Sequence, residues 1–137
     1  MQAGPGAAAQ LVRERLRALC AGAYPDLATL AAAVERVETP CAVFRIVDPD
    51  VPVVLALTNP AFRAQFGDRP APEIVDRRLT VELETQHFRR TLLADGEAAQ
   101  MMSLLTPRGP LYVNVQAMRV AVADRPDDDL YLSLSGF

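Results

Sequence analysis

The sequence is poor in the residues that most often carry catalytic or metal chemistry. Its 137 residues include one histidine, His87, and two cysteines, Cys20 and Cys41. A single histidine makes a catalytic site of the Ser-His-Asp or Cys-His type difficult to form. Two cysteines are too few for a disulfide framework, and their spacing is not that of metal ligands. A glycine-rich phosphate loop and the HExxH, GxSxG and CxxC motifs are also missing. We therefore predict neither an enzyme nor a metal site.

Long hydrophobic runs and an excess of positive charge are missing as well. No run of about eighteen apolar residues occurs, so no membrane span is predicted. The net charge of −3 argues against a nucleic-acid partner, which requires a concentrated basic face. The first residues, MQAGPGAAAQ, carry no positive charge before an apolar stretch and so do not resemble a secretory signal. We expect a cytoplasmic protein without a membrane or nucleic-acid partner.

The apolar residues that are present follow helical spacing in the first third of the chain. They recur at steps of three and four in Ala7–Ala21 and again in Pro25–Glu38, which predicts two amphipathic helices. Pro25 suits the first position of the second helix. Thr39-Pro40 ends this helix, because the residue before a proline is pushed out of helical space.

The next stretch predicts a hairpin followed by a short helix. Two apolar runs, Val43–Val47 and Val53–Leu57, flank the turn sequence Asp-Pro-Asp, as in two antiparallel strands. Asn59 suits a helix N-cap and Pro60 the first helical position, while Gly67 can close the helix. The local pattern is therefore strand, strand and one capped helix.

The second half of the chain predicts more helix and then three strands. Residues 74–86 suggest one or two short helical turns, and His87–Ala94 suggests a helix closed by Asp95-Gly96. Three strand candidates follow, joined by short turns, and can pair as an antiparallel meander: Glu97–Thr106, Leu111–Ala123 and a last strand with Leu130, Leu132 and Leu134. The predicted fold class is α+β, with a five-stranded antiparallel sheet, helices on one face and N-terminal amphipathic helices before it.

Four segments resemble the PAS domain, the small bacterial sensor module of the PAS/PAC sensory family: IVDPD, TNPAFRAQFG, HFRRTLLADGE and RGPLYVNVQAMRVAVAD. The resemblance covers residues 40–137 and leaves residues 1–39 as an N-terminal helical extension for dimerisation and signal transfer. It implies a helical middle packed over one sheet face around a small cavity. It also implies a non-catalytic signal-transduction module that binds a small ligand or a partner. PAS relatives continue into output domains, so an output partner such as a histidine kinase or a nucleotide cyclase is expected after Phe137.

The resemblance leaves the cofactor open. Some haem-binding PAS domains carry their iron ligand on the helix that here holds His87, so a haem sensor with His87 as axial ligand is one alternative. Light-sensing LOV relatives attach flavin through a cysteine in the helical middle, but residues 68–86 contain none, so we expect no covalent flavin. A second alternative, from another class, is a small cone-shaped α+β enzyme or carrier.

Two sets of apolar residues are the candidate sites. The large side chains of the hairpin and of the helices predict a ligand cavity bordered by Phe44, Ile46, Leu55, Leu57, Phe62, Phe66 and Leu92. The helix Pro25–Glu38 is expected to cover the second sheet face with Leu27, Leu30, Val34 and Val37. The first helix then keeps an unpartnered stripe, which predicts a homodimer interface formed by Val12, Leu16 and Leu19. The alternative is that this helix folds back onto its own domain.

Two amides on the strand Leu111–Ala123 have two interpretations. If Asn114 and Gln116 faced the core they would need hydrogen-bond partners, and a bound ligand is one source of them. We interpret both as surface residues.

Overall fold

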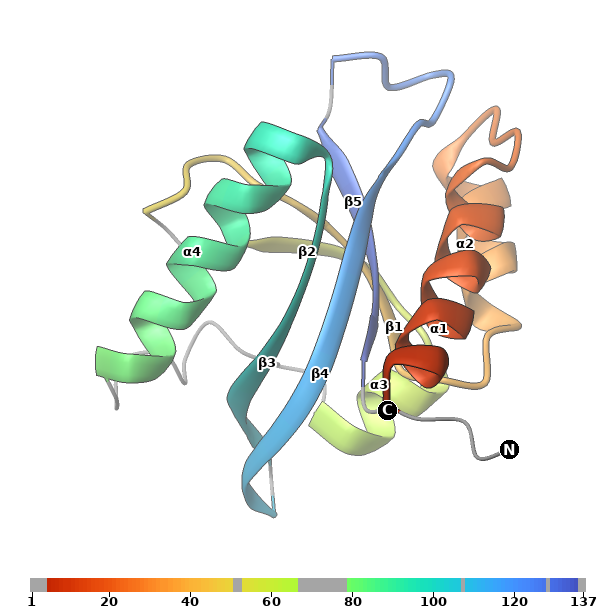
Figure 1. The fold of residues 1–137 in the computed structure, drawn as a ribbon. Helices are drawn as coiled ribbons and strands as arrows, with labels where there is room; N and C mark the ends of the chain where they lie inside the picture. The colour runs from red at the N-terminus through yellow and green to blue at the C-terminus, as the bar shows by residue number, and fades with distance from the viewer. Residues whose placement is uncertain (1–4, 51–52, 67–78, 107, 128, 136–137) are drawn as a thin grey trace.

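The computed structural model describes residues 5–50, 53–66, 79–106, 108–127 and 129–135. Five strands form one antiparallel sheet in the order β2-β1-β5-β4-β3 (Figure 1): β1 Cys41–Arg45, β2 Val54–Thr58, β3 Glu97–Thr106, β4 Gly109–Val120 and β5 Leu130–Ser135. The last strand in sequence is central in the sheet, and all six of its residues are buried. The predicted hairpin and meander are both confirmed, and β5 joins them.

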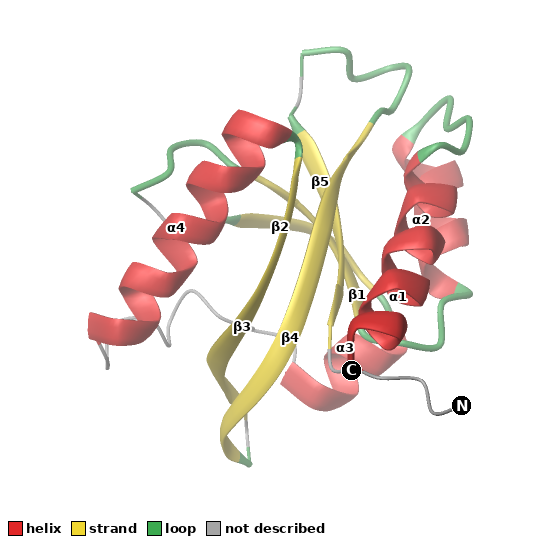
Figure 2. Cartoon of the chain, viewed as in Figure 1, coloured by secondary structure: helices red, strands yellow, loops and turns green. Residues whose placement is uncertain are grey.

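Four helices cover the two faces of this sheet: α1 Pro5–Cys20, α2 Leu27–Glu35, α3 Pro60–Phe66 and α4 Leu79–Asp95. α1 and α2 lie on one face and α4 lies on the other, with α3 near one end of the sheet (Figures 1 and 2). The sheet is therefore the middle layer of three. No helix in the described ranges is both long and apolar enough to cross a bilayer.

The helices differ at their ends from the sequence expectation. α1 spans Pro5–Cys20 rather than Ala7–Ala21, and α2 ends at Glu35 rather than at Glu38, with Arg36 as its C-cap. α2 begins at Leu27 rather than at Pro25, because the Asp26 carboxylate accepts a 2.8 Å hydrogen bond from the Thr29 N–H and acts as the N-cap. α4 begins at Leu79, so the region expected to form short turns continues into the predicted helix His87–Ala94. Residues 74–78 lie outside the described residues. Gly96 has a φ of +76° and ends α4, as predicted, since glycine adopts this left-handed conformation without strain.

Each sheet face has its own hydrophobic core. The α1/α2-side core contains Leu16, Leu30, Val34, Cys41, Val43, Val120, Val122, Leu130, Leu132 and Leu134. The α4-side core contains Phe44, Ile46, Phe88, Leu92, Met102, Val113, Val115, Ala117 and Tyr131. The prediction that α2 covers the second face is confirmed, since Leu30 and Val34 are fully buried there and Leu27 and Val37 pack against them.

Asn59 connects the elements at one end of the sheet. Its buried Oδ1 accepts hydrogen bonds from the Phe62 N–H and the Cys41 N–H, both at 2.9 Å. Its Nδ2 donates to the backbone oxygens of Val37 and Thr39 at 2.7 and 2.8 Å. The predicted N-cap is therefore confirmed. The Asn59 amide also links the α2–β1 connection to the start of α3 by hydrogen bonds.

Candidate functional site

The α4-side core lies where the sequence predicts a ligand cavity. Phe44, Ile46 and Leu92 meet there, and Leu55 packs against them. The rings of Phe44 and Tyr131 are stacked, with centroids 6.0 Å apart and an interplanar angle of 23°. Four of the seven predicted cavity residues therefore share one cluster.

Two of the other predicted cavity residues, Leu57 and Phe62, lie outside this cluster. Phe62 is buried in a separate group with Ala42 and Leu55. Leu57 packs against the α1/α2-side core, so its assignment to the cavity is wrong. A β-bulge is the cause: Leu57 pairs with Val43 and Leu55 pairs with Phe44, and the extra residue between them breaks the alternation of faces. The side chain of Phe66 lies outside the described residues.

α4 is fastened to the connection between β1 and β2. The Arg89 side chain is only 5% exposed and its Nε donates a 2.9 Å hydrogen bond to the Pro49 backbone oxygen. Arg90 and Gln86 both donate to the Asp50 carboxylate, Arg90 at 3.1 Å. Sequence reasoning missed these contacts, because helical arginines beside polar residues are usually solvated and the partners lie 36 to 40 positions away in the sequence.

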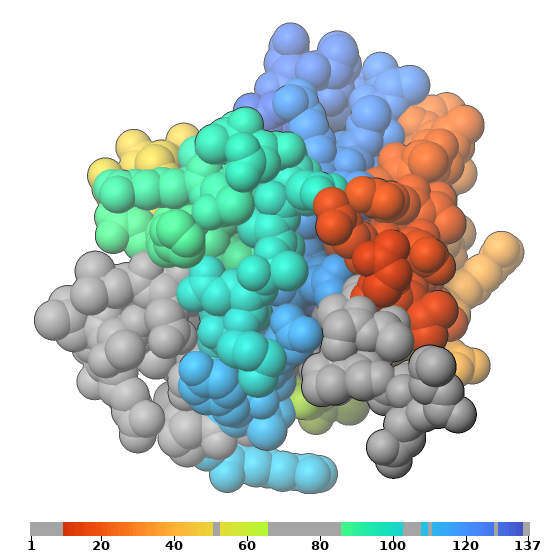
Figure 3. All heavy atoms as spheres, viewed as in Figure 1, coloured from red at the N-terminus to blue at the C-terminus, as the bar shows by residue number. Residues whose placement is uncertain are grey.

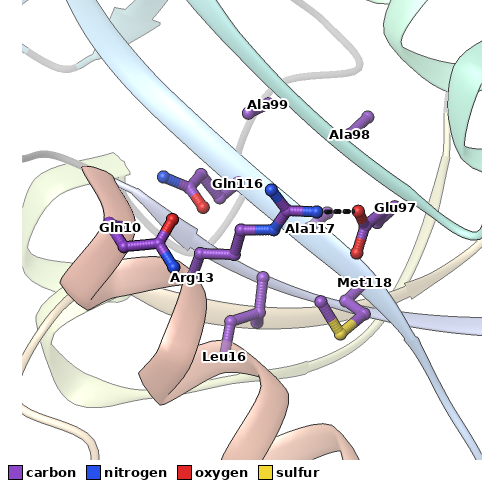
Figure 4. A pocket seen from close by; sticks show the side chains of 9 residues that line it. All are labelled: Gln10, Arg13, Leu16, Glu97, Ala98, Ala99, Gln116, Ala117 and Met118. Atoms are coloured by element: carbon purple, nitrogen blue, oxygen red, sulfur yellow. Dashed lines mark hydrogen bonds and ion pairs between the residues drawn. The ribbon is translucent and has the colours of Figure 1, made fainter. Parts of the chain in front are cut away.

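A groove opens between α1 and the β3–β4 hairpin. Its volume is about 350 Å³, and we call it the α1 groove; its lining residues are Gln10, Arg13, Leu16, Glu97, Ala98, Ala99, Gln116, Ala117 and Met118 (Figure 4). In the space-filling view, α1 (red) and β3 (teal) flank a strip of β4 atoms (blue) at this place (Figure 3). The Arg13 side chain crosses the groove from α1 and forms an ion pair with Glu97 at the start of β3.

Comparison with known proteins identifies the fold. No protein-family model matches the sequence, and no curated protein is significantly similar to it. Among solved structures, a fungal LOV domain photoreceptor matches with a TM-score of 0.53 at 21% identity, over 91% of this chain and 89% of that one. A PAS domain from Colwellia psychrerythraea matches with a TM-score of 0.53 at 11% identity, over 80% and 94% of the two chains. The chain has the PAS fold.

A third structure with the PAS fold is an RNA-binding light-oxygen-voltage receptor. It matches with a TM-score of 0.51 at 20% identity over 80% of this chain. The match covers only 32% of that receptor, so the chain spans about a third of its length. The predicted resemblance is confirmed at the level of the fold.

Within this PAS fold His87 does not reach the α4-side core. Its side chain is exposed in the middle of α4, while the inward positions are those of Phe88 and Leu92. An axial ligand must point at an iron held among buried side chains, and the phase of α4 turns His87 to solvent. The geometry therefore offers no support for a haem sensor with His87 as axial ligand.

The stripe predicted as a dimer interface has a partner inside its own chain. Leu16 is 2% exposed and belongs to the α1/α2-side core, against which Val12 and Leu19 also pack. The premise that α2 alone covers this face is wrong, because α1 lies over β4 and β5. Among residues 10–20 of α1, Leu11 is the large hydrophobic side chain that is exposed, at 64%.

Gln116 corrects another expectation. It is 4% exposed and lines the α1 groove, because the face of β4 that we interpreted as solvent-exposed lies beneath α1. Arg13 and Glu97 were not candidates from sequence. Arg13 alternates with Arg15 and Arg17 along α1, and nothing in that pattern distinguishes the arginine that crosses the groove.

The two thiols belong to the α1/α2-side core rather than to a reactive site: Cys41 is buried in it, and the half-buried Cys20 packs against it. Burial raises the pKa of both Cys20 and Cys41 to about 12, and the Cys20 Sγ lies 3.6 Å from the Met118 backbone oxygen. Both therefore stay protonated at neutral pH and are poor nucleophiles. Among the described residues, no group of three or more His, Cys, Asp or Glu side chains is placed to hold a metal ion.

Proposed function

We propose that the chain is a sensory module of a signal-transduction protein, in which the α4-side core responds to a small ligand or a partner and the N-terminal helices carry the response. The observation that supports this is the position of the sheet between the two cores. Tyr131 belongs to the α4-side core, while its neighbours Leu130 and Leu132 belong to the α1/α2-side core. Likewise Phe44 and Val43 pack on opposite faces.

This alternation provides a mechanical path across the sheet. Side chains of successive residues in a strand point to opposite faces and share one backbone. Because the side chains of both cores are buried and in contact with their neighbours, a displacement of Tyr131 by a ligand would move Leu130 and Leu132 against the α1/α2-side core. The proposal is a shift between two populations and requires a ligand that binds one of them more tightly.

α4 is the element best placed to respond first. Its Leu92 is completely buried in the α4-side core. Its ion pair with the β1–β2 connection is exposed, with side-chain exposures of 60% for Arg90 and 61% for Asp50. Such an exposed pair contributes only about 0–1 kcal/mol. The stronger contact is the hydrogen bond from the buried Arg89 to the Pro49 backbone oxygen, so a shift of α4 would move the β1–β2 connection with it.

The proposal includes a homodimer formed through α1. Because Leu16 is buried within its own chain, the contact must use another part of this helix. A second copy would contact the exposed Leu11 rather than the stripe that packs on the sheet. An output domain such as a histidine kinase or a nucleotide cyclase and a cytoplasmic location complete the proposed setting.

A native mass spectrum and an absorption spectrum of freshly purified protein test the ligand part of the proposal. The expected result is a small molecule that leaves under denaturing conditions. Val113→Phe, which enlarges a buried side chain of the α4-side core, should purify without it, while the exposed Leu93→Ala should retain it. A wild-type spectrum with the mass of the polypeptide alone would contradict a tightly held ligand.

A further inference from the structure

We propose that the α1 groove is a second binding site, which takes a small zwitterion of the free α-amino acid class with a short aliphatic side chain. The groove lies on the sheet face opposite the α4-side core, so the inference does not depend on the proposed function. It rests on the charges, the amides and the apolar surface that the groove brings together (Figure 4).

The charges of the groove select a ligand that carries both signs. Arg13 supplies a guanidinium and Glu97 a carboxylate, and the two side chains are 42% and 38% exposed, so a solute can reach them. A guanidinium binds a carboxylate through two parallel hydrogen bonds, and a carboxylate accepts from an ammonium group. The carboxylate of a zwitterion can bind Arg13 while its ammonium group binds Glu97, so both side chains keep a partner of opposite charge. A simple anion or amine would leave one of the two charges without a partner.

The amides add hydrogen-bonding capacity beside the ion pair. Gln10 projects from α1 and Gln116 from β4, and Figure 4 places both on the same side of the groove, next to the Arg13 side chain. Each primary amide carries donors and an acceptor. The exposed Gln10 can therefore offer polar atoms to a bound α-carboxylate or α-ammonium group, and the buried Gln116 adds to the polar lining.

The rest of the lining limits the size of the ligand. Ala99 leaves room beside β3, and Leu16 and Met118 provide apolar surface; Ala98 and Ala117 also line the groove, although their side chains pack on the α4-side core. The volume of about 350 Å³ is near the lower end of the range for small-molecule sites. A short aliphatic side chain against Leu16 and Met118 fits this lining better than a large or charged one.

Binding at this place also bears on α1. The Arg13–Glu97 pair joins α1 to the start of β3. A ligand that takes over both charges replaces this direct link with contacts through itself. The groove thus gives the N-terminal helix a ligand-dependent attachment to the sheet.

Isothermal titration calorimetry with the full chain tests the site. The probes are glycine, L-alanine and L-leucine, together with N-acetyl-L-leucine, which lacks the ammonium group, and L-leucinamide, which lacks the carboxylate. At least one free amino acid should bind saturably, with L-leucine or L-alanine tighter than glycine. Both blocked forms should bind at least tenfold more weakly. Failure of all three free amino acids to bind, or equal binding of the blocked forms, would overturn the proposal.

Variants locate the binding. Arg13→Gln and Glu97→Gln should each weaken it at least tenfold, whereas Arg17→Gln, on the same helix but outside the groove, should bind as the wild type does. Arg13→Lys keeps the charge and should bind more tightly than Arg13→Gln. Circular dichroism identifies any variant that does not fold. Equal affinity of folded Arg13→Gln and wild type, or of Arg13→Lys and Arg13→Gln, would refute the assignment of Arg13.

Discussion

Replacing Asn59 should destabilise the domain far more than the loss of a helix cap does. The buried side chain makes four hydrogen bonds, to the N–H groups of Phe62 and Cys41 and to the oxygens of Val37 and Thr39. Asn59→Ala removes the cap of α3, which costs about 1 kcal/mol. It also leaves the Cys41 N–H and two carbonyl groups without this partner, at about 1 kcal/mol each. The expected loss in the free energy of unfolding is therefore about 3–5 kcal/mol.

Asn59→Asp separates capping from the remaining hydrogen bonds. Aspartate caps helices about as well as asparagine, so a capping role alone predicts almost no change. In this structure the second carboxylate oxygen would face the oxygens of Val37 and Thr39, which now accept hydrogen bonds from Nδ2. An ionised carboxylate has no hydrogen to donate. We therefore expect Asn59→Asp to lose at least about 2 kcal/mol at pH 7, despite its intact cap.

Urea denaturation followed by far-UV circular dichroism measures both losses. The sequence has no tryptophan, so the backbone signal is the stronger probe. The slope of the free energy against urea should stay unchanged, which shows that the folded state has kept its compactness. If Asn59→Asp unfolds within about 0.5 kcal/mol of the wild type, the account of Asn59 as a four-way connector is wrong.

Three further predictions concern single side chains. Leu16→Glu places a carboxylate in the α1/α2-side core and should prevent folding. Leu11→Glu should fold, and light scattering should find it monomeric at concentrations where the wild type dimerises. A dimer of Leu11→Glu would contradict the proposed contact. Leu92→Ala removes a completely buried side chain and should cost about 2–5 kcal/mol in urea denaturation, while Leu93→Ala should cost below about 1 kcal/mol; equal losses would contradict the phase of α4. Burial raises the pKa of Cys41 from 9.0 to about 12, so above pH 9 the unfolded chain releases a proton that the folded chain keeps. Cys41 should therefore lower the stability by up to about 1.4 kcal/mol per pH unit between these values, in addition to the similar contribution of Cys20, and Cys41→Ala should reduce the slope of stability against pH.

Local rules were sufficient where the deciding contact lies within a few residues. Asn59 and Pro60 predict the start of α3, and Gly96 predicts the end of α4, because caps and turns depend on neighbouring backbone groups. The alternation in β4 predicts that Val113 and Val115 share one buried face.

Contacts between distant segments were beyond these rules. The bulge that turns Leu57 to the other face arises from its pairing with β1, and the alternation of β2 alone does not reveal it. The apolar stripe of α1 predicts that Leu16 is covered, but it does not show which surface covers it. A second copy of the chain and the chain's own sheet were therefore equally good candidates, and the structure shows the sheet. The ion pair of Arg13 and Glu97 joins residues that are 84 positions apart.

Hydrogen exchange in α1 tests the central claim, that the sheet carries a change in the α4-side core to the N-terminal helices. The perturbation is Leu92→Ala, which lies in the α4-side core, on the sheet face opposite α1. Phe62→Ala is the control, because it creates space in a separate cluster with Ala42. At matched global stability, Leu92→Ala should speed amide exchange in α1 and α2 as well as in α4, and Phe62→Ala should not. If Leu92→Ala alters exchange only in α4 and the strands beneath it, the sheet does not couple the two cores.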